Sequence, residues 1–196
     1  MRLPRVLVLS GSTRSGSFNT KLAALVGKRL ALSEVEVTRI SLADYPLPLY
    51  DGDLETAKGV PQNAQVLKSL FLQQEGVFIA CPEYNAGITP VLKNAIDWMS
   101  RASSPGEPPK AAFKNRVFAL GSAATGALGG MRGLIGMRTI MEVGLGAHVL
   151  PQMVSVTNAR TGFDMKGDLT DERAAQQLDI LIQAMVRQTQ LQLFGR

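Results

Sequence analysis

Short apolar runs alternate with longer segments of helical periodicity, and this alternation restricts the fold more than any other feature of the chain. The runs predict strands at residues 5–9, 35–40, 76–81, 116–120 and 147–156. The periodic segments predict helices at residues 19–31, 64–74, 89–100, 131–143 and 171–193. Parallel neighbours need a crossover, usually a helix, so this pattern predicts a three-layer α/β fold with a five-stranded parallel sheet.

Three prolines and two glycines make residues 44–61 an expected irregular excursion, and residues 103–109 an expected surface turn. Pro151 is expected to interrupt the last strand, and Thr170 to open the last helix together with Asp171. No repeat or second domain is indicated, so we expect one domain over residues 1–196.

Length, charge and rare residues exclude several classes of function. The apolar run at Val6–Leu9 is shorter than the roughly 7–15 residues of a secretory signal, and no run approaches the ~18 residues of a membrane span. We therefore expect a cytoplasmic protein without a membrane partner. The net charge of +5 is scattered rather than clustered, which favours small anionic ligands over nucleic acid. One cysteine (Cys81) and one histidine (His148) exclude a disulfide framework and a His-rich metal site, and both are expected to be packed structural residues.

The loop after the first strand, residues 11–19, reads Gly-Ser-Thr-Arg-Ser-Gly-Ser-Phe-Asn. It places hydroxyls and Arg14 directly before a helix, whose N-terminus has unpaired N–H groups and suits a phosphate monoester. An ordinary capped polar loop is the structural alternative. The loop is not a Walker A motif, a Gly-x-Gly-x-x-Gly motif or a Gly-x-Ser-x-Gly elbow.

Two further loops follow the third and fourth strands. Residues 82–87, Pro-Glu-Tyr-Asn-Ala-Gly, offer a tyrosine ring and backbone N–H groups to a flat ligand, although Tyr84 could instead cover the sheet edge. Thr89 is expected to cap the next helix, with Pro90 in its first turn. Residues 121–130 are small and permit close approach by a ligand, and Gly133 and Gly136 could equally serve helix–sheet packing.

The first loop would form a phosphate cradle, the second an aromatic clamp and the third a smooth wall. Together they suit a phosphorylated planar cofactor. FMN fits, and it binds at the switch point of flavodoxin-like sheets with strand order 2-1-3-4-5. We therefore expect that order here.

The first two loops, with Leu-Lys-Asn-Ala-Ile-Asp-Trp at residues 92–98, resemble the NADPH-dependent FMN reductase family, which includes quinone, chromate and azo-dye reductases. The resemblance covers about residues 5–156. It implies that the FMN phosphate is held by Ser12, Arg14, Ser17 and Asn19, with Phe18 in the same motif. It implies that the isoalloxazine ring is lined by Pro82, Glu83, Tyr84 and Asn85. It implies that the site is closed by residues 122–126, from Ser122 to Gly126.

The family implies a homodimer or homotetramer with the flavin near the subunit interface, and many members have serine or threonine where this chain has Gly87. We expect ping-pong transfer of a hydride from NADPH (or NADH) to FMN, and then to a small acceptor such as a quinone, free flavin, chromate or an azo compound. The flavin supplies the chemistry, so no catalytic side chain is assigned. Candidates for the 2′-phosphate of NADPH are Arg14, Arg101, Arg132 and Arg138. The alternatives are a flavodoxin-like electron carrier, disfavoured by a pI of about 9.6, and a flavin-binding regulatory or scaffold protein.

Overall fold

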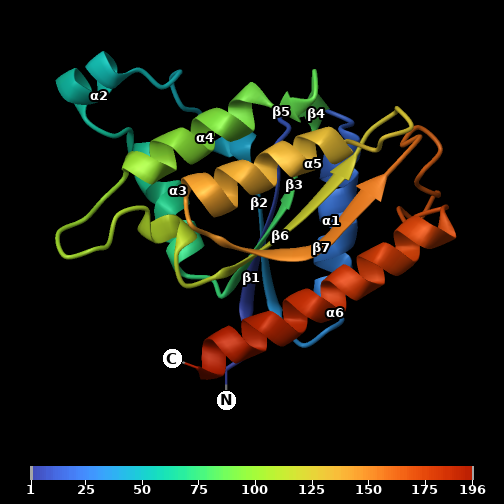
Figure 1. Ribbon diagram of the computed structural model, residues 1–196. Helices are drawn as coiled ribbons and strands as arrows, with labels where there is room; N and C mark the ends of the chain where they lie inside the picture. Colours follow the sequence, from blue (N-terminus) through green and yellow to red (C-terminus); the bar gives the residue numbers. More distant parts are fainter. Residues whose placement is uncertain (1, 196) are drawn as a thin grey trace.

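Five apolar segments pair side by side into one parallel sheet in the computed structural model, which describes residues 2–195 (Figure 1). The strands are β1 (Arg5–Ser10), β2 (Glu36–Ser41), β3 (Gly76–Ala80), β6 (Val117–Ala123) and β7 (His148–Val156). Their order is β2-β1-β3-β6-β7, which is the expected flavodoxin-like 2-1-3-4-5 order when only the strands of this sheet are counted. The predicted fold class is confirmed.

Helices cover both faces of the sheet (Figure 1). The helices are α1 (Phe18–Ala31) and α6 (Glu172–Phe194) on one face, and α3 (Gln62–Leu72), α4 (Pro90–Arg101) and α5 (Met131–Arg138) on the other. Side chains of a strand alternate between faces, so Val6 and Val8 pack toward α1 while Leu7 and Leu9 join the opposite core. Every residue of β3 and β6 is buried, as expected of central parallel strands.

The prediction of an irregular excursion at residues 44–61 is wrong in part. A 3₁₀ turn at Leu42–Asp44 precedes it, and helix α2 (Gly52–Lys58) lies within it. The carboxylate of Asp51 caps α2 by accepting hydrogen bonds from the N–H groups of Asp53 and Leu54. No residue of α2 is buried, so the helix has no apolar stripe from which its period could be recognised.

Two loop predictions and one predicted helix end also need correction. Strand β6 continues to Ala123, so the third loop begins later than residue 121. Residues 82–87 are not an open loop, because β4 (Glu83–Tyr84) and β5 (Gly87–Ile88) pair as an antiparallel hairpin. Helix α5 ends earlier than predicted, and a π-helical segment, Thr139–Gly144, continues it.

The helix and strand ends follow local chemistry. Thr89 caps α4 as predicted, by accepting a hydrogen bond from the N–H of Leu92. The last helix is capped by Asp171, whose carboxylate accepts from Ala174 N, rather than by Thr170. Strand β7 passes through Pro151 with an irregular register rather than a break: Phe118 pairs with Val149, but Leu120 pairs with Met153.

The single histidine and cysteine have different environments. His148 is exposed at the start of β7, so the expectation of a packed histidine is wrong. Cys81 is fully buried, and burial raises the pKa of its thiol, as expected for an inert packing residue. Within residues 2–195, no helix combines the length and apolar character that crossing a bilayer requires.

Candidate functional site

The three loops predicted to carry function meet at the carboxyl edge of the sheet, because β1, β3 and β6 are neighbours. Backbone hydrogen bonds join neighbouring strands near the points where these loops begin. Gly11 N donates to Ala80 O at 2.8 Å, and Cys81 N donates to Gly121 O at 2.7 Å. The Thr89 hydroxyl donates to Gly11 O at 2.6 Å, which ties the start of α4 to the first loop. The sheet therefore fixes the relative position of the loops.

The first loop leaves the N-terminus of α1 open to an anion. Ser17 occupies the N-cap position, yet its side chain makes no capping hydrogen bond, and the first turn contains no acidic residue. The Arg14 guanidinium is exposed and, among the described residues, donates only to the carbonyl of Ser15, at 3.3 Å, while Arg14 N donates to Ser12 Oγ. These unpaired donors fit the phosphate of FMN, which would complete the cap.

Asn19 has a different local role from the other members of this motif. Its amide Nδ2 donates to Ala123 O at 2.8 Å, and its Oδ1 accepts from Ala123 N at 3.0 Å. Asn19 is buried, so both hydrogen bonds are shielded from water. Asn19 thereby fastens the first turn of α1 to the end of β6. Phe18 is half-buried, and the Lys21 ammonium lies 5.8 Å from its ring centroid.

The hairpin of β4 and β5 turns through two residues with left-handed backbone. Asn85 and Ala86 have φ values of 51° and 65°, which is the conformation of a type I′ turn. Ala86 carries a strained backbone here, because left-handed φ favours glycine or asparagine. Gly87 needs no such freedom, and a Cβ there would lie 3.6 Å from Tyr84 O, an ordinary contact. Tyr84 is 54% exposed, so its ring is accessible at the tip.

The Glu83 carboxylate joins this hairpin to the N-terminus of α5. One oxygen accepts from the Arg132 guanidinium, with Nε at 2.8 Å, and the other accepts from Gly133 N at 3.0 Å. Burial alone would raise the pKa of Glu83, but the hydrogen bonds from Gly133 and Arg132 outweigh it and lower the pKa. A Cβ at Gly133 would lie 3.2 Å from Glu83 Cβ, which supports the packing interpretation for that glycine. The space around Gly136 is open.

The third loop begins beside a buried hydroxyl. Ser122 is fully buried, and its Oγ has no hydrogen-bond partner among the described residues. A Cβ at Gly130 would lie 1.9 Å from that oxygen, and Gly130 has a φ of +86°, so only glycine fits. Between this loop and the hairpin is a pocket of about 530 Å³, lined by Glu83, Asn85, Ala86, residues 124–130 and Arg132.

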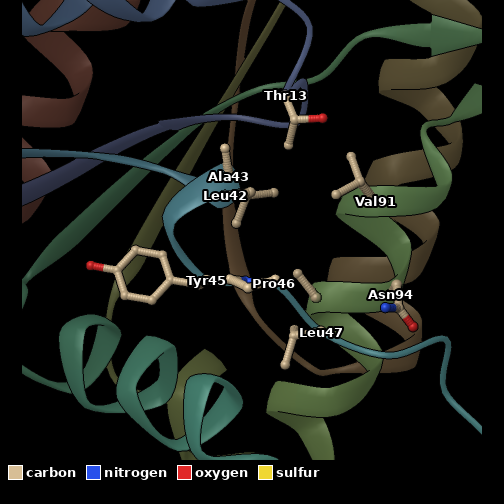
Figure 2. A pocket seen from close by; sticks show the side chains of 9 residues that line it. Thr13, Leu42, Ala43, Tyr45, Pro46, Leu47, Val91 and Asn94 are labelled. Atoms are coloured by element: carbon tan, nitrogen blue, oxygen red, sulfur yellow. The ribbon is translucent and has the colours of Figure 1, made fainter.

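A second pocket, of about 300 Å³, extends from the first loop to the hairpin and is lined by Gly11, Ser12, Thr13, Arg14, Tyr84, Thr89, Pro90 and Val91. A third, of about 310 Å³, shares Thr13 and Val91 with it. Figure 2 shows Leu42 and Ala43 of the 3₁₀ turn on one side of this third pocket, and Val91 and Asn94 of α4 on the other. Sequence reasoning missed this wall, because it comes from the segment next to β2 that carries no recognisable chemical motif.

Most predicted site residues lie at one of the first two pockets: Ser12, Arg14, Glu83, Tyr84, Asn85 and Gly126. The others are packed beneath or beside them: Ser17, Phe18, Asn19, Pro82 and Ser122. Pro82 is buried, and its ring would lie 3.1 Å from a Cβ at Gly11. The donor-rich helix terminus, the exposed tyrosine and the small-residue wall thus fit a phosphorylated flavin.

Comparisons with known proteins agree with this site. The family model for NADPH-dependent FMN reductase matches residues 4–161. The chain is 33% identical over 183 residues to an NAD(P)H-dependent FMN reductase of Pseudomonas aeruginosa, covering 92% of each chain. It is 36% identical over 138 residues to a quinone reductase of Escherichia coli, covering 70% of this chain and 69% of that protein.

Among solved structures, the chain is similar to FerB, a flavoenzyme NAD(P)H:(acceptor) oxidoreductase from Paracoccus denitrificans. The TM-score is 0.76 at 25% identity, and the match covers 96% of this chain and 98% of that one. The family model covers most of the chain, and the relative from Pseudomonas aeruginosa aligns over nearly its whole length. The chain belongs to the NADPH-dependent FMN reductase family.

Proposed function

We propose that this oxidoreductase, whose cofactor is FMN and whose electron donor is NAD(P)H, reduces a small acceptor by a ping-pong mechanism. The proposed acceptors are a quinone, free flavin, chromate or an azo compound. One observation carries the proposal: the uncapped N-terminus of α1, with Arg14 beside it, lies at the same sheet edge as the exposed Tyr84 and the pocket of about 530 Å³.

The FMN phosphate would be held by the hydroxyls of Ser12 and Ser17, by Arg14 and by the open N–H groups of α1. Asn19 supports this site by fixing α1 to β6. Tyr84 and Asn85 would line the flavin ring, with Pro82 beneath them and Glu83 holding the hairpin in place. Ser122 and Gly126 belong to the wall opposite the hairpin.

When bound, FMN would supply the redox chemistry that carries a hydride equivalent from the nicotinamide to the acceptor. The side chains of this chain bind and orient, and none is required as an acid or base. The hairpin and residues 124–130 line the pocket, and free N–H groups that they turn toward the flavin would stabilise negative charge that develops there. The pocket is open to solvent, and donor and acceptor would use the same face of the flavin in turn.

We further propose that the chain acts as one domain in a cytoplasmic homodimer or homotetramer. Three large apolar side chains on α5 or in the segments that flank it are exposed: Leu128, Ile135 and Val143. Such side chains suit an interface between copies. Light scattering coupled to size-exclusion chromatography tests the oligomer, and a monomer would contradict it.

Titration of the cofactor-free protein with FMN and with riboflavin tests the phosphate site. Fluorescence quenching should show that FMN binds at least about tenfold more tightly than riboflavin. Riboflavin has no phosphate and cannot form the charge-assisted hydrogen bonds to this site. R14A should bring FMN affinity down toward that of riboflavin, whereas R173A, an exposed arginine on α6, should not. Equal affinity for the two flavins would rule out the assigned phosphate site.

Initial rates measured at several acceptor concentrations test the ping-pong order. Double-reciprocal plots should give parallel lines.

A further inference from the structure

A polar pocket of about 260 Å³ lies at the carboxyl ends of β1 and β2, on the face of the sheet that α1 covers. It shares Ser12 with the pocket beside the hairpin but is otherwise built from different residues. Its polar lining consists of Ser10, Ser12, Thr20, Arg39, Ser41 and Asp44. Four hydroxyls and a guanidinium in one small pocket form a donor set for an anion.

The register of the sheet explains why these side chains converge. Ser10 pairs directly with Ser41, and Val8 pairs with Arg39. Side chains two residues apart share a face, so Ser10, Arg39 and Ser41 follow Val8 toward α1. Ser10 is only 6% exposed, and its Oγ has no hydrogen-bond partner in the described part of the chain. A buried hydroxyl without a partner at the base of a polar pocket indicates a ligand that supplies one.

Arg39 also differs from the arginines that the sequence suggested as phosphate ligands. Arg101 is paired with Glu55, Arg132 with Glu83 and Arg138 with Glu142. Arg14 belongs to the FMN phosphate loop. Arg39, by contrast, forms no ion pair with any carboxylate within residues 2–195 and lines an open pocket. It is therefore the arginine that an additional phosphate group would find available at this edge.

The position suits the far end of a nicotinamide nucleotide. Strand β2 lies three strand spacings from β6, roughly 14 Å. The proposed flavin pocket adjoins the loop that follows β6, and an extended dinucleotide spans that separation. A phosphate monoester would take donors from Arg39 and the hydroxyls, while the Asp44 carboxylate would accept from a ribose hydroxyl. A ribose that carries both a phosphate and a free hydroxyl therefore matches the guanidinium and the carboxylate of this pocket.

We propose that the pocket at the ends of β1 and β2 binds the 2′-phosphate of NADPH, and that Arg39 sets a preference for NADPH over NADH. The assignment rests on the proposed function, because it needs NADPH as the donor. The pocket shares Ser12 with the FMN phosphate loop, but its other lining residues lie outside that loop, so it should remain available when FMN is bound.

Isothermal titration calorimetry of the FMN-loaded protein with 2′,5′-ADP tests the site without turnover. Wild-type protein should bind 2′,5′-ADP about tenfold more tightly than 5′-AMP, which has the same 5′-phosphate but lacks the 2′-phosphate. R39Q should abolish that difference, and R39K should restore part of it. The matched control is R187Q, which removes the same charge from an exposed position on α6. Binding of 2′,5′-ADP only to the FMN-free protein would assign the pocket to the FMN phosphate and overturn the proposal.

Steady-state kinetics adds a second readout. R39Q should raise the KM for NADPH about tenfold while the KM for NADH and both kcat values stay within about twofold. Equal changes for the two nucleotides, or none, would overturn the role of Arg39. Absence of turnover with both nucleotides would instead contradict the proposed function, and the calorimetric comparison would still report on the pocket. The two failures are therefore distinguishable.

Discussion

The Glu83 carboxylate and the Arg132 guanidinium form an ion pair that joins the β4–β5 hairpin to α5, with Arg132 Nε 2.8 Å from a carboxylate oxygen. The second oxygen accepts from Gly133 N, so both ends of the carboxylate are used. The hairpin that presents Tyr84 and Asn85 is thus fixed by a buried charge at its base. These contacts couple the hairpin to the N-terminus of α5, which directly follows the small-residue wall.

E83Q keeps the shape of the side chain but removes the charge, so the hairpin should be held less firmly. We expect the free energy of unfolding to fall by about 1 kcal/mol and FMN affinity to fall several-fold. The matched control is E142Q, which breaks the Arg138 ion pair on the other end of the same helix. Chemical denaturation and flavin titration measure both quantities. An E83Q protein with wild-type FMN affinity would contradict the positioning role.

N19A removes two buried hydrogen bonds between α1 and β6. We expect a loss of about 2–3 kcal/mol in the free energy of unfolding and weaker FMN binding, because the first turn of α1 is no longer fixed. N63A, which removes one exposed hydrogen bond to Pro46 O, should cost less than 1 kcal/mol. If urea denaturation finds the two variants equally stable, Asn19 does not fasten the helix.

Ala86 has a φ of 65°, a conformation that costs a non-glycine residue roughly 1 kcal/mol. A86G should therefore raise the melting temperature, although glycine normally lowers it through the entropy of the unfolded chain. Ala127 provides the control, because its φ is not positive. A127G should lower the melting temperature or leave it unchanged. A lower melting temperature for A86G would show that the turn is unstrained.

Glu75 gives the expected pH dependence of stability. Burial raises its pKa, but hydrogen bonds from the Arg2 side chain and Arg5 N outweigh this and hold the pKa below its usual value of 4.5. A carboxylate with a lowered pKa in the folded state stabilises above the unfolded pKa, and that contribution is lost as the pH falls through the folded pKa. E75Q should thus be less stable than wild type at pH 7, with a gap that narrows below pH 4.5. Urea denaturation at pH 7 and pH 3 tests this, and the exposed E34Q should show no gap.

The sheet order was predictable because it needs only the alternation of elements and the loops that mark the switch point. The site residues were predictable by type but not by role. Asn19 and Glu83 were assigned to the cofactor, yet their hydrogen-bond partners lie 104 and about 50 residues away in sequence. Such partners depend on how α1 and α5 dock against the sheet, which no local pattern encodes.

Arg39 and α2 were missed for related reasons. Arg39 lies on an exposed edge strand without a motif, and its relation to Ser10 follows only from the pairing register of β1 with β2. Helix α2 has no buried residue. The only signal for this helix that can be read from the sequence is its N-cap, Asp51. Both cases need the tertiary structure, because hydrophobic periodicity is absent where nothing is buried.

Anaerobic addition of NADPH to the purified protein tests whether it is an FMN-dependent reductase. We expect a visible flavin absorbance spectrum that bleaches on addition of NADPH and returns when a quinone is added. A colourless protein that also fails to take up added FMN would contradict the cofactor assignment, and a bound flavin that neither NADPH nor NADH bleaches would contradict the reductase.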